Sequence, residues 1–383
     1  MLTTIRWLGN ALMAAVFYAA ASAHALPFTS LNVFGDSLSD SGNAYLALGG
    51  TIPFPPFPPG SITVPPYPLI PDAPYPRGAL LIPALTNGPN WAEVLGASLK
   101  LPVVPSILGG SNFAFAGADS GPLPGVTPNA SPTLVTQFFG PAAPPALPFF
   151  GGGPIDPNAL YAVWGGNNDV QRALDVYFAT LIATGGDATA AFIAASAVVS
   201  AGAANVASIL SGIAAGGGKH ILSMNVPDVG LAPAMDFAPP GTAALATALS
   251  IAFNTALTPF ILGIEAGFGV DVIEVDVFAL LHGVVASPAS FGLSNVTDPC
   301  LQIGGAGICA DPNAYLFWDG IHPTAAGHRI IGLAAAAAII PSPNTGSLLV
   351  LGLTVIALSG CFGSRRRLMG LGLAGPGWSR RRK

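Results

Sequence analysis

Charged side chains are scarce in this chain of 383 residues. Lys, Arg, Asp and Glu make up 8% of it, against about a quarter in ordinary soluble domains. The formal net charge is -5, and no basic stripe lies outside the extreme ends. We therefore expect no nucleic-acid partner, because binding to phosphates needs a clustered positive surface.

Cysteine is also sparse, with three residues in the whole chain. Neither their spacing nor any convincing pair of His ligands fits a zinc site, so we expect no metal. Cys300 and Cys309 flank the short loop CLQIGGAGIC, and in an exported protein a local disulfide between them is the leading interpretation. Cys361 lies in an apolar run, where a cysteine acts as a small hydrophobe.

Hydrophobic residues are abundant by contrast, at 51% of the sequence, and both ends carry apolar runs. The first segment opens with Arg6, continues through an Ala-rich run and reaches Ala23-His24-Ala25, the small-x-small pattern that signal peptidase accepts. We interpret residues 1–25 as a signal peptide, so the protein is expected to be exported. A buried N-terminal helix is the alternative.

The C-terminal end resembles a sorting signal. Residues 346–363 form an apolar run without a charge, about long enough to cross a bilayer, and the arginines at 365–367 would stay in the cytoplasm. The order PSPNTG, apolar run and arginine cluster resembles the PEP-CTERM signal of Gram-negative bacteria, with Pro-Ser-Pro at 341–343 in place of Pro-Glu-Pro and an extension beyond the arginines. We expect a sorting segment over 341–383 with a transmembrane helix at about 346–363; a buried terminal helix is the alternative.

These two ends predict a location and two partners. The domain between the two ends would face the periplasm while the C-terminal helix holds it in the inner membrane. We expect a sorting protease as a partner, whose cleavage would release the domain to the cell surface or the medium.

Residues 26–340 read as one domain. Short β-branched runs alternate with Ala-rich segments, which is typical of βαβ units around a mostly parallel sheet. The expected strands cover residues 31–35, 111–117, 160–166, 220–226 and 270–278, and the expected helices cover 90–99, 187–215, 242–267 and 324–340. Pro323 suits a first helical position. In such sheets ligands gather at the carboxyl ends of the strands.

Two proline-rich stretches, 51–76 and 140–158, interrupt this alternation. They fit neither helix nor central strand, so we expect surface loops. Their aromatic residues either line a site for an acyl chain or pack within the loops themselves. These residues are Phe54, Phe57, Tyr67, Phe149 and Phe150.

Ser37 follows the first expected strand, in LNVFGDSLSDSGN. It is a candidate nucleophile, although small polar residues are also ordinary turn content. A serine needs a histidine base, an orienting carboxylate and donors for the oxyanion. In LFWDGIHPTAAGH, Asp319 and His322 are close enough for the carboxylate to reach the imidazole locally; capping of the following helix is the alternative. We interpret His220, His282 and His328 as structural.

Two further segments offer oxyanion donors. Gly117 ends an expected strand in GGSNFAFAGADSG, where a missing side chain lets a backbone N–H approach a substrate oxygen. Asn168 follows another strand in VWGGNNDV, and its amide can donate a second hydrogen bond. With the Ser37 N–H they make a set of donors for one oxyanion. Taken alone, either segment also fits a simple turn.

The order FGDSLSDSGN, NFAFAG, GGNND, DGIHPT resembles the block sequence of the GDSL, or SGNH, hydrolase family over nearly all of residues 26–340. The resemblance implies a flavodoxin-like α/β fold, a three-layer αβα sandwich with a mostly parallel five-stranded sheet. It implies Ser37 as nucleophile, His322 as base, Asp319 as its orienter, and Gly117 and Asn168 as oxyanion donors beside the Ser37 N–H. The Gly-x-Ser-x-Gly elbow of α/β-hydrolases does not fit, because Ser39 stands where the second glycine belongs.

The function implied is an exported serine hydrolase that cleaves lipid, aryl or short-acyl carboxylic esters through an acyl-enzyme on Ser37, without a metal or organic cofactor. A carbohydrate O-acetyl esterase stays open, because pocket walls that the sequence does not locate set the acyl length. A catalytically inactive envelope or matrix protein on the same fold also stays open, since a fold does not by itself prove activity.

Overall fold

A computed structural model describes residues 28–47, 84–141, 148–302 and 307–339. They belong to one compact unit, Ala25–Ile339. The expected signal peptide at 1–25, the proline-rich stretch at 51–76 and the expected sorting segment at 341–383, with its transmembrane run and Cys361, lie outside the described residues.

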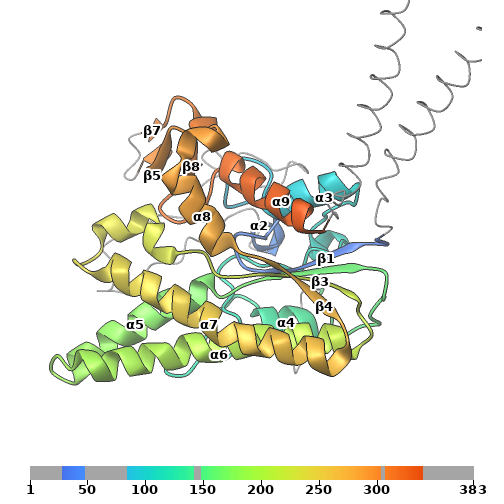
Figure 1. The fold of residues 1–383 in the computed structure, drawn as a ribbon, viewed down its shortest axis with the longest axis horizontal. Coiled ribbons are helices and arrows are strands. Elements are labelled where there is room, and N and C mark those ends of the chain that lie inside the picture. Colours follow the sequence, from blue (N-terminus) through green and yellow to red (C-terminus); the bar gives the residue numbers. More distant parts are fainter. Residues whose placement is uncertain (1–27, 48–83, 142–147, 303–306, 340–383) are drawn as a thin grey trace, which may run out of the picture. The chain divides into compact units, whose positions relative to one another are not determined.

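The centre of this unit is a parallel sheet of four strands in the order β1-β2-β3-β4 (Figure 1). The strands are β1 Leu31–Gly35, β2 Leu160–Trp164, β3 His220–Met224 and β4 Asp271–Val275. Side chains alternate between the two faces of a strand. In β2, Leu160, Ala162 and Trp164 face one hydrophobic cluster while Tyr161 and Val163 face another. The sheet is therefore covered on both faces, which makes a three-layer sandwich.

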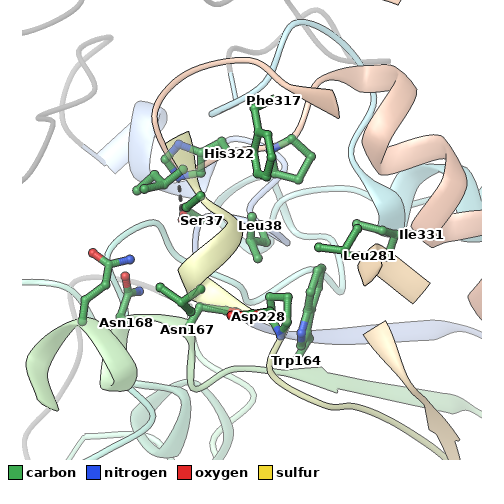
Figure 2. Close-up of a pocket in the computed structure, with 16 residues that line it drawn as sticks. Ser37, Leu38, Trp164, Asn167, Asn168, Asp228, Leu281, Phe317, His322 and Ile331 are labelled. Atoms are coloured by element: carbon green, nitrogen blue, oxygen red, sulfur yellow. Dashed lines mark hydrogen bonds between the residues drawn. The ribbon is translucent and has the colours of Figure 1, made fainter. Parts of the chain in front are cut away.

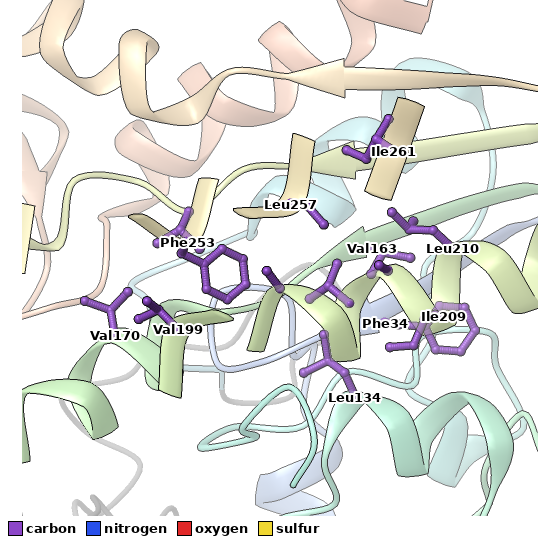
Figure 3. Close-up of a cluster of buried hydrophobic side chains, with 14 of the residues drawn as sticks. Phe34, Leu134, Val163, Val170, Val199, Ile209, Leu210, Phe253, Leu257 and Ile261 are labelled. Carbon is purple, nitrogen blue, oxygen red and sulfur yellow. The ribbon is translucent and has the colours of Figure 1, made fainter. Parts of the chain in front are cut away.

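One face of the sheet is covered by four helices, which lie below it in Figure 1. These are α4 Leu134–Phe139, α5 Asn167–Ala183, α6 Ala188–Ala215 and α7 Thr242–Phe268. The larger core cluster lies between them and the sheet (Figure 3), where Phe34 and Val163 from the strands meet Leu134, Leu210 and Phe253 from the helices. Helices α6 and α7 are long and apolar enough to cross a membrane by length and composition, but both contribute buried residues to this core.

The other face is covered by α3 Trp91–Leu99, α8 Val277–Ala286 and α9 Ala325–Ile339. Helix α3 begins with a capping box, in which Asn90 accepts from the Glu93 N–H and the Glu93 carboxylate accepts from the Asn90 N–H. Short elements complete the unit, beginning with helix α2 Asn43–Ala47. Two small sheets pair β5 Asn295–Pro299 with β8 Tyr315–Phe317, and β6 Leu301–Gln302 with β7 Gly307–Ile308. Short 3-10 helices lie at Ser106–Leu108, Val229–Leu231, Pro233–Phe237, Pro288–Phe291 and Pro312–Ala314.

The prediction of a fifth strand at 111–117 was wrong. The segment does lie beside β1, because the Val33 N–H donates to Ser111 O and the Phe113 N–H donates to Val33 O. The Phe115 N–H also donates to Gly35 O. The ladder is nevertheless incomplete, because the Gly35 N–H donates to Gln137 Oε1 and not to the segment. The segment therefore makes only isolated bridges, from Asn112 to Val33 and to Pro105.

Two boundaries also differ from the prediction. Strand β4 stops at Val275, because Asp276 accepts the Ala279 N–H and caps α8. Helix α9 begins at Ala325, with the Thr324 hydroxyl accepting from the Gly327 N–H. Pro323 therefore precedes the cap and is not the first helical residue.

Phe150, from the second proline-rich stretch, packs among the rings of Phe34, Phe113, Phe138 and Tyr161. These rings belong to or pack against the larger core cluster. For this residue the structure favours packing against the core over lining an acyl site.

Candidate active site

Ser37 sits on a tight turn at the carboxyl end of β1. The turn is held by Asp36, whose carboxylate accepts the Leu38 N–H and whose carbonyl accepts the N–H groups of Ser39 and Asp40. At Gly35 a side chain is excluded, since a Cβ there would lie 2.7 Å from Trp164 O. The turn therefore fixes Ser37 at the edge of the sheet where ligands gather.

The loop between β8 and α9 carries Asp319 and His322, and the His322 imidazole faces Ser37 in Figure 2. His322 Nε2 lies 2.9 Å from Ser37 Oγ, and His322 Nδ1 lies 2.8 Å from Asp319 Oδ2. Asp319 Oδ1 accepts the backbone N–H groups of Ile321 and His322. The carboxylate thus shapes its own loop and orients the imidazole toward the serine, bringing together the three residues that the sequence singled out.

Burial and the interactions with His322 shift the pKa values of Asp319 and His328. Asp319 is 1% exposed. Burial raises its pKa, but the electrostatic interaction with His322 and the hydrogen bonds from the His322 side chain and two backbone N–H groups outweigh burial and hold the pKa below its ordinary value. His328 on α9 is also buried, and burial with repulsion from His322 lowers its pKa to about 3. His328 is therefore neutral in the fold, which agrees with a structural role.

A disulfide braces the loop that carries Asp319 and His322. The structure joins Cys300 to Cys309, and the Cys300 N–H donates to Phe317 O while the neighbouring Leu301 N–H donates to Trp318 O. Cys300 is fully buried. The cross-linked segment therefore holds the backbone immediately before Asp319.

Of the three donors that the sequence expects at an oxyanion site, Ser37 and Asn168 line one cavity with His322, whereas Gly117 is not among its lining residues. No atom of the described residues accepts the backbone N–H of Ser37 or of Gly117, and Gly117 has φ +76°, in the region that favours glycine. Asn168 donates through Nδ2 to Ala118 O at 2.8 Å. Since an amide nitrogen carries two hydrogens, one N–H of Asn168 stays available to the cavity that it lines.

Sequence reasoning missed the buried acids behind this site. Asn167 donates to Asp36 Oδ2 at 2.8 Å, and the Ser120 N–H donates to Asp169 Oδ1 at 2.9 Å. Burial raises the pKa of Asp36 to about 6 and that of Asp169 to about 7, against the hydrogen bonds that lower them. The run GGNND indicated a site, because three polar residues follow a strand in succession. It did not indicate which of the three would be buried.

Asp40 was also missed, and it ties the serine turn to the Gly117 loop. Its two carboxylate oxygens accept four backbone N–H groups, from Gly42, Asn43, Ala44 and Ala116. Burial raises its pKa in spite of these bonds. Ala116 directly precedes Gly117, so Asp40 links the turn of Ser37 to the segment that carries Gly117.

A cavity of about 60 Å³ opens beside Ser37 (Figure 2). Its polar lining residues are Ser37, Asn167, Asn168, Gln171, Asp228 and His322. Its apolar lining residues include Leu38, Trp164, Leu281, Phe317 and Ile331, of which Trp164, Leu281 and Ile331 lie on the side away from His322 and Asn168 in Figure 2. The arrangement fits a ligand with a polar reacting group and a short apolar chain. Within the described residues no group of three or more His, Cys, Asp or Glu side chains is placed to hold a metal ion.

Comparison with known proteins decides the family. The sequence model of the GDSL-like lipase/acylhydrolase family matches residues 31–335. The chain belongs to this family. The matched segment is thus a domain of a carboxylic ester hydrolase family, and it contains every GDSL block that the sequence presented.

Similar proteins include several with esterase names. The chain is 29% identical, over 80% of its length, to an uncharacterized protein of the trpE–trpG intergenic region of Pseudomonas putida, and covers 47% of it. It is 34% identical to esterase EstA of Pseudomonas aeruginosa, over 30% of this chain and 18% of the esterase. A GDSL esterase/lipase of Arabidopsis thaliana is 24% identical over 32% of this chain and 38% of its own length. The chain spans less than half of each.

Proposed function

We propose that the protein is a serine esterase that hydrolyses carboxylic esters through an acyl-enzyme on Ser37. One observation carries this proposal: the continuous hydrogen-bonded chain from Ser37 Oγ through His322 to the Asp319 carboxylate. Membership of the GDSL-like lipase/acylhydrolase family supports it. A serine without such a base is a poor nucleophile, so this geometry has a direct chemical consequence.

In the first half of the reaction, His322 Nε2 takes the Ser37 proton while Oγ attacks the ester carbonyl carbon. The N–H groups of Ser37 and Gly117 and the Asn168 amide stabilise the oxyanion that forms. His322 then returns the proton to the leaving alkoxide, which departs as the alcohol. Asp319 holds the imidazole in the tautomer that this transfer needs.

In the second half, water enters beside His322 and repeats the steps. The imidazole takes a proton from the water, the hydroxide adds to the acyl carbon, and the proton passes to Ser37 Oγ as the acid leaves. The free enzyme is regenerated without a change in oxidation state. The residues therefore account for hydrolysis without an organic cofactor.

The substrate we propose has an apolar acyl group, as in a lipid, aryl or short-acyl ester, because most of the side chains that line the cavity are apolar. A carbohydrate O-acetyl esterase is the second candidate, since the cavity is small enough to suit a short acyl group. The two differ in their alcohol and in the length of acyl chain they accept.

The test is hydrolysis of p-nitrophenyl acetate, butyrate and a longer ester by the purified chain. The proposal expects turnover that a fluorophosphonate abolishes. A strict preference for acetate, with activity on acetylated sugars, would favour the second candidate. Absence of turnover on every ester would instead support an inactive envelope or matrix protein.

We further propose that the protein is exported and tethered. The supporting features are the signal-like run at 1–25 and the apolar run at 346–363 with its arginines. The full chain is expected in the membrane pellet after a salt wash, whereas a version that ends at Ile340 should be soluble and active. Equal solubility of both from the earliest times after synthesis would overturn the tether.

A further inference from the structure

Two segments from different parts of the chain line the cavity beside Ser37. Helix α8 contributes Leu281, and the segment after β3 contributes Pro227, Asp228, Val229 and Ala232. Leu281 and Val229 are largely buried. The size of the cavity therefore depends on how closely α8 approaches the segment 226–232.

The carboxylate of Asp228 joins these two segments. Asp228 Oδ2 lies 2.9 Å from Nε2 of His282, the residue that follows Leu281 on α8. Asp228 Oδ1 accepts the Gly230 N–H at 2.8 Å and the Thr247 hydroxyl at 2.7 Å. The Asp228 side chain is 3% exposed, while that of His282 is 47% exposed. Asp228 is thus held by its own segment and by Thr247 on α7, and its contact with His282 attaches α8 to it.

Helix α8 has a second, separate attachment at its first turn. The Phe278 N–H donates to Asn225 Oδ1, and Asn225 Nδ2 donates to Asp276 Oδ1. This attachment does not involve His282. Loss of the His282 contact would therefore free the part of α8 that carries Leu281 without detaching the start of the helix.

We propose that the Asp228–His282 pair is a specificity-determining clamp, which holds Leu281 against the cavity and limits the length of acyl chain accepted. This inference rests on the proposed esterase function. Neither His282 nor Thr247 lines the cavity. The clamp acts through the position of Leu281 and takes no part in the proton transfers.

The test compares kcat/KM for p-nitrophenyl octanoate and acetate in the full chain and its variants. His282→Leu removes the contact at a half-exposed position, so the octanoate-to-acetate ratio is expected to rise at least about fourfold, the worth of one buried methylene. His282→Gln, which keeps a donor, should restore a ratio near that of the wild type. Thr247→Val is the matched control: it removes a bond to the same carboxylate but leaves α8 attached, so its ratio should match the wild type.

Leu281→Phe provides an independent measurement in the opposite direction, because a larger side chain at the cavity should lower the octanoate-to-acetate ratio. An unchanged ratio in His282→Leu, or an equal rise in Thr247→Val, would overturn the clamp. These results are distinct from failure of the proposed function, in which the wild type would hydrolyse neither ester.

Discussion

Asn167 and Asn168 are adjacent in the sequence, yet their amides serve different partners. Asn167 donates to the Asp36 carboxylate, whereas Asn168 donates to Ala118 O and keeps a second N–H for the cavity. The two neighbouring asparagines therefore have different roles: Asn167 supports the fold, and Asn168 serves the proposed reaction.

Replacement of these residues tests that separation. Asn168→Ala is expected to lower kcat by roughly 10²- to 10³-fold with a smaller change in KM, because its bond strengthens as charge develops on the oxyanion. Asn167→Ala should instead lower the melting temperature, since it leaves a buried oxygen of Asp36 without its side-chain donor. Steady-state kinetics and thermal unfolding of both variants supply the check. The reverse pattern would mean that Asn167 carries the oxyanion role.

The sequence indicated the residues of the candidate site, but not the buried side chains that hold them in place. Ser37, Gly117, Asn168, Asp319 and His322 stand in four segments whose order is characteristic of one family. Asp40 and Asp169 are ordinary polar residues in the sequence. Their role arises because the fold buries them against segments that are distant in the sequence. Such long-range contacts leave no local pattern.

At the scale of elements, Asp40 connects the turn after β1 to the loop that ends at Gly117. Asp40→Asn replaces one acceptor oxygen by a donor, which would face backbone N–H groups that are themselves donors. We expect the free energy of unfolding to fall by about 2–4 kcal/mol, the effect of two lost buried hydrogen bonds. Denaturant unfolding measures this, with Asp311→Asn, at an exposed cap of a 3-10 turn, as the control. If the free energy of unfolding falls no more than in the control, the turn and the loop stay in contact without Asp40.

The errors in predicting elements have related causes. The segment 111–117 has the composition of a strand, but the Gly35 N–H of β1 donates to Gln137 Oε1 and leaves the ladder incomplete. Helix α5 was missed because Gly166, with φ +106°, is its N-cap and no side chain caps it. The strands β1 to β3 and helices α3, α6 and α7 were predicted within a few residues, because each has a clear apolar pattern.

At the scale of the whole molecule, buried acids couple stability to pH. The pKa of Asp169 rises from 3.8 to about 7 in the fold, chiefly through burial. The folded state therefore binds this proton more tightly than the unfolded chain, so the stabilisation is fully present below about pH 4 and is lost as pH rises to about 7.

Asp169→Asn should remove this dependence. A shift of about three pKa units corresponds to at most about 4 kcal/mol, and the variant should gain stability relative to the wild type over that interval. Urea unfolding at several pH values gives the difference in unfolding free energy, and Asp236→Asn at an exposed position is the control. A difference that stays constant with pH would mean that Asp169 is ionised in the fold or that its charge is solvated.

The most direct test of the proposed reaction is to find where the acyl group goes. The full chain is mixed with p-nitrophenyl butyrate, quenched in acid during the first turnovers, and its peptides are mapped by mass spectrometry. The proposal predicts a butyryl group on Ser37, absent from Ser37→Ala, whose turnover falls by several orders of magnitude. A butyryl group on another residue, or a Ser37→Ala variant with more than about a tenth of wild-type turnover, would contradict the assignment of Ser37 as the nucleophile.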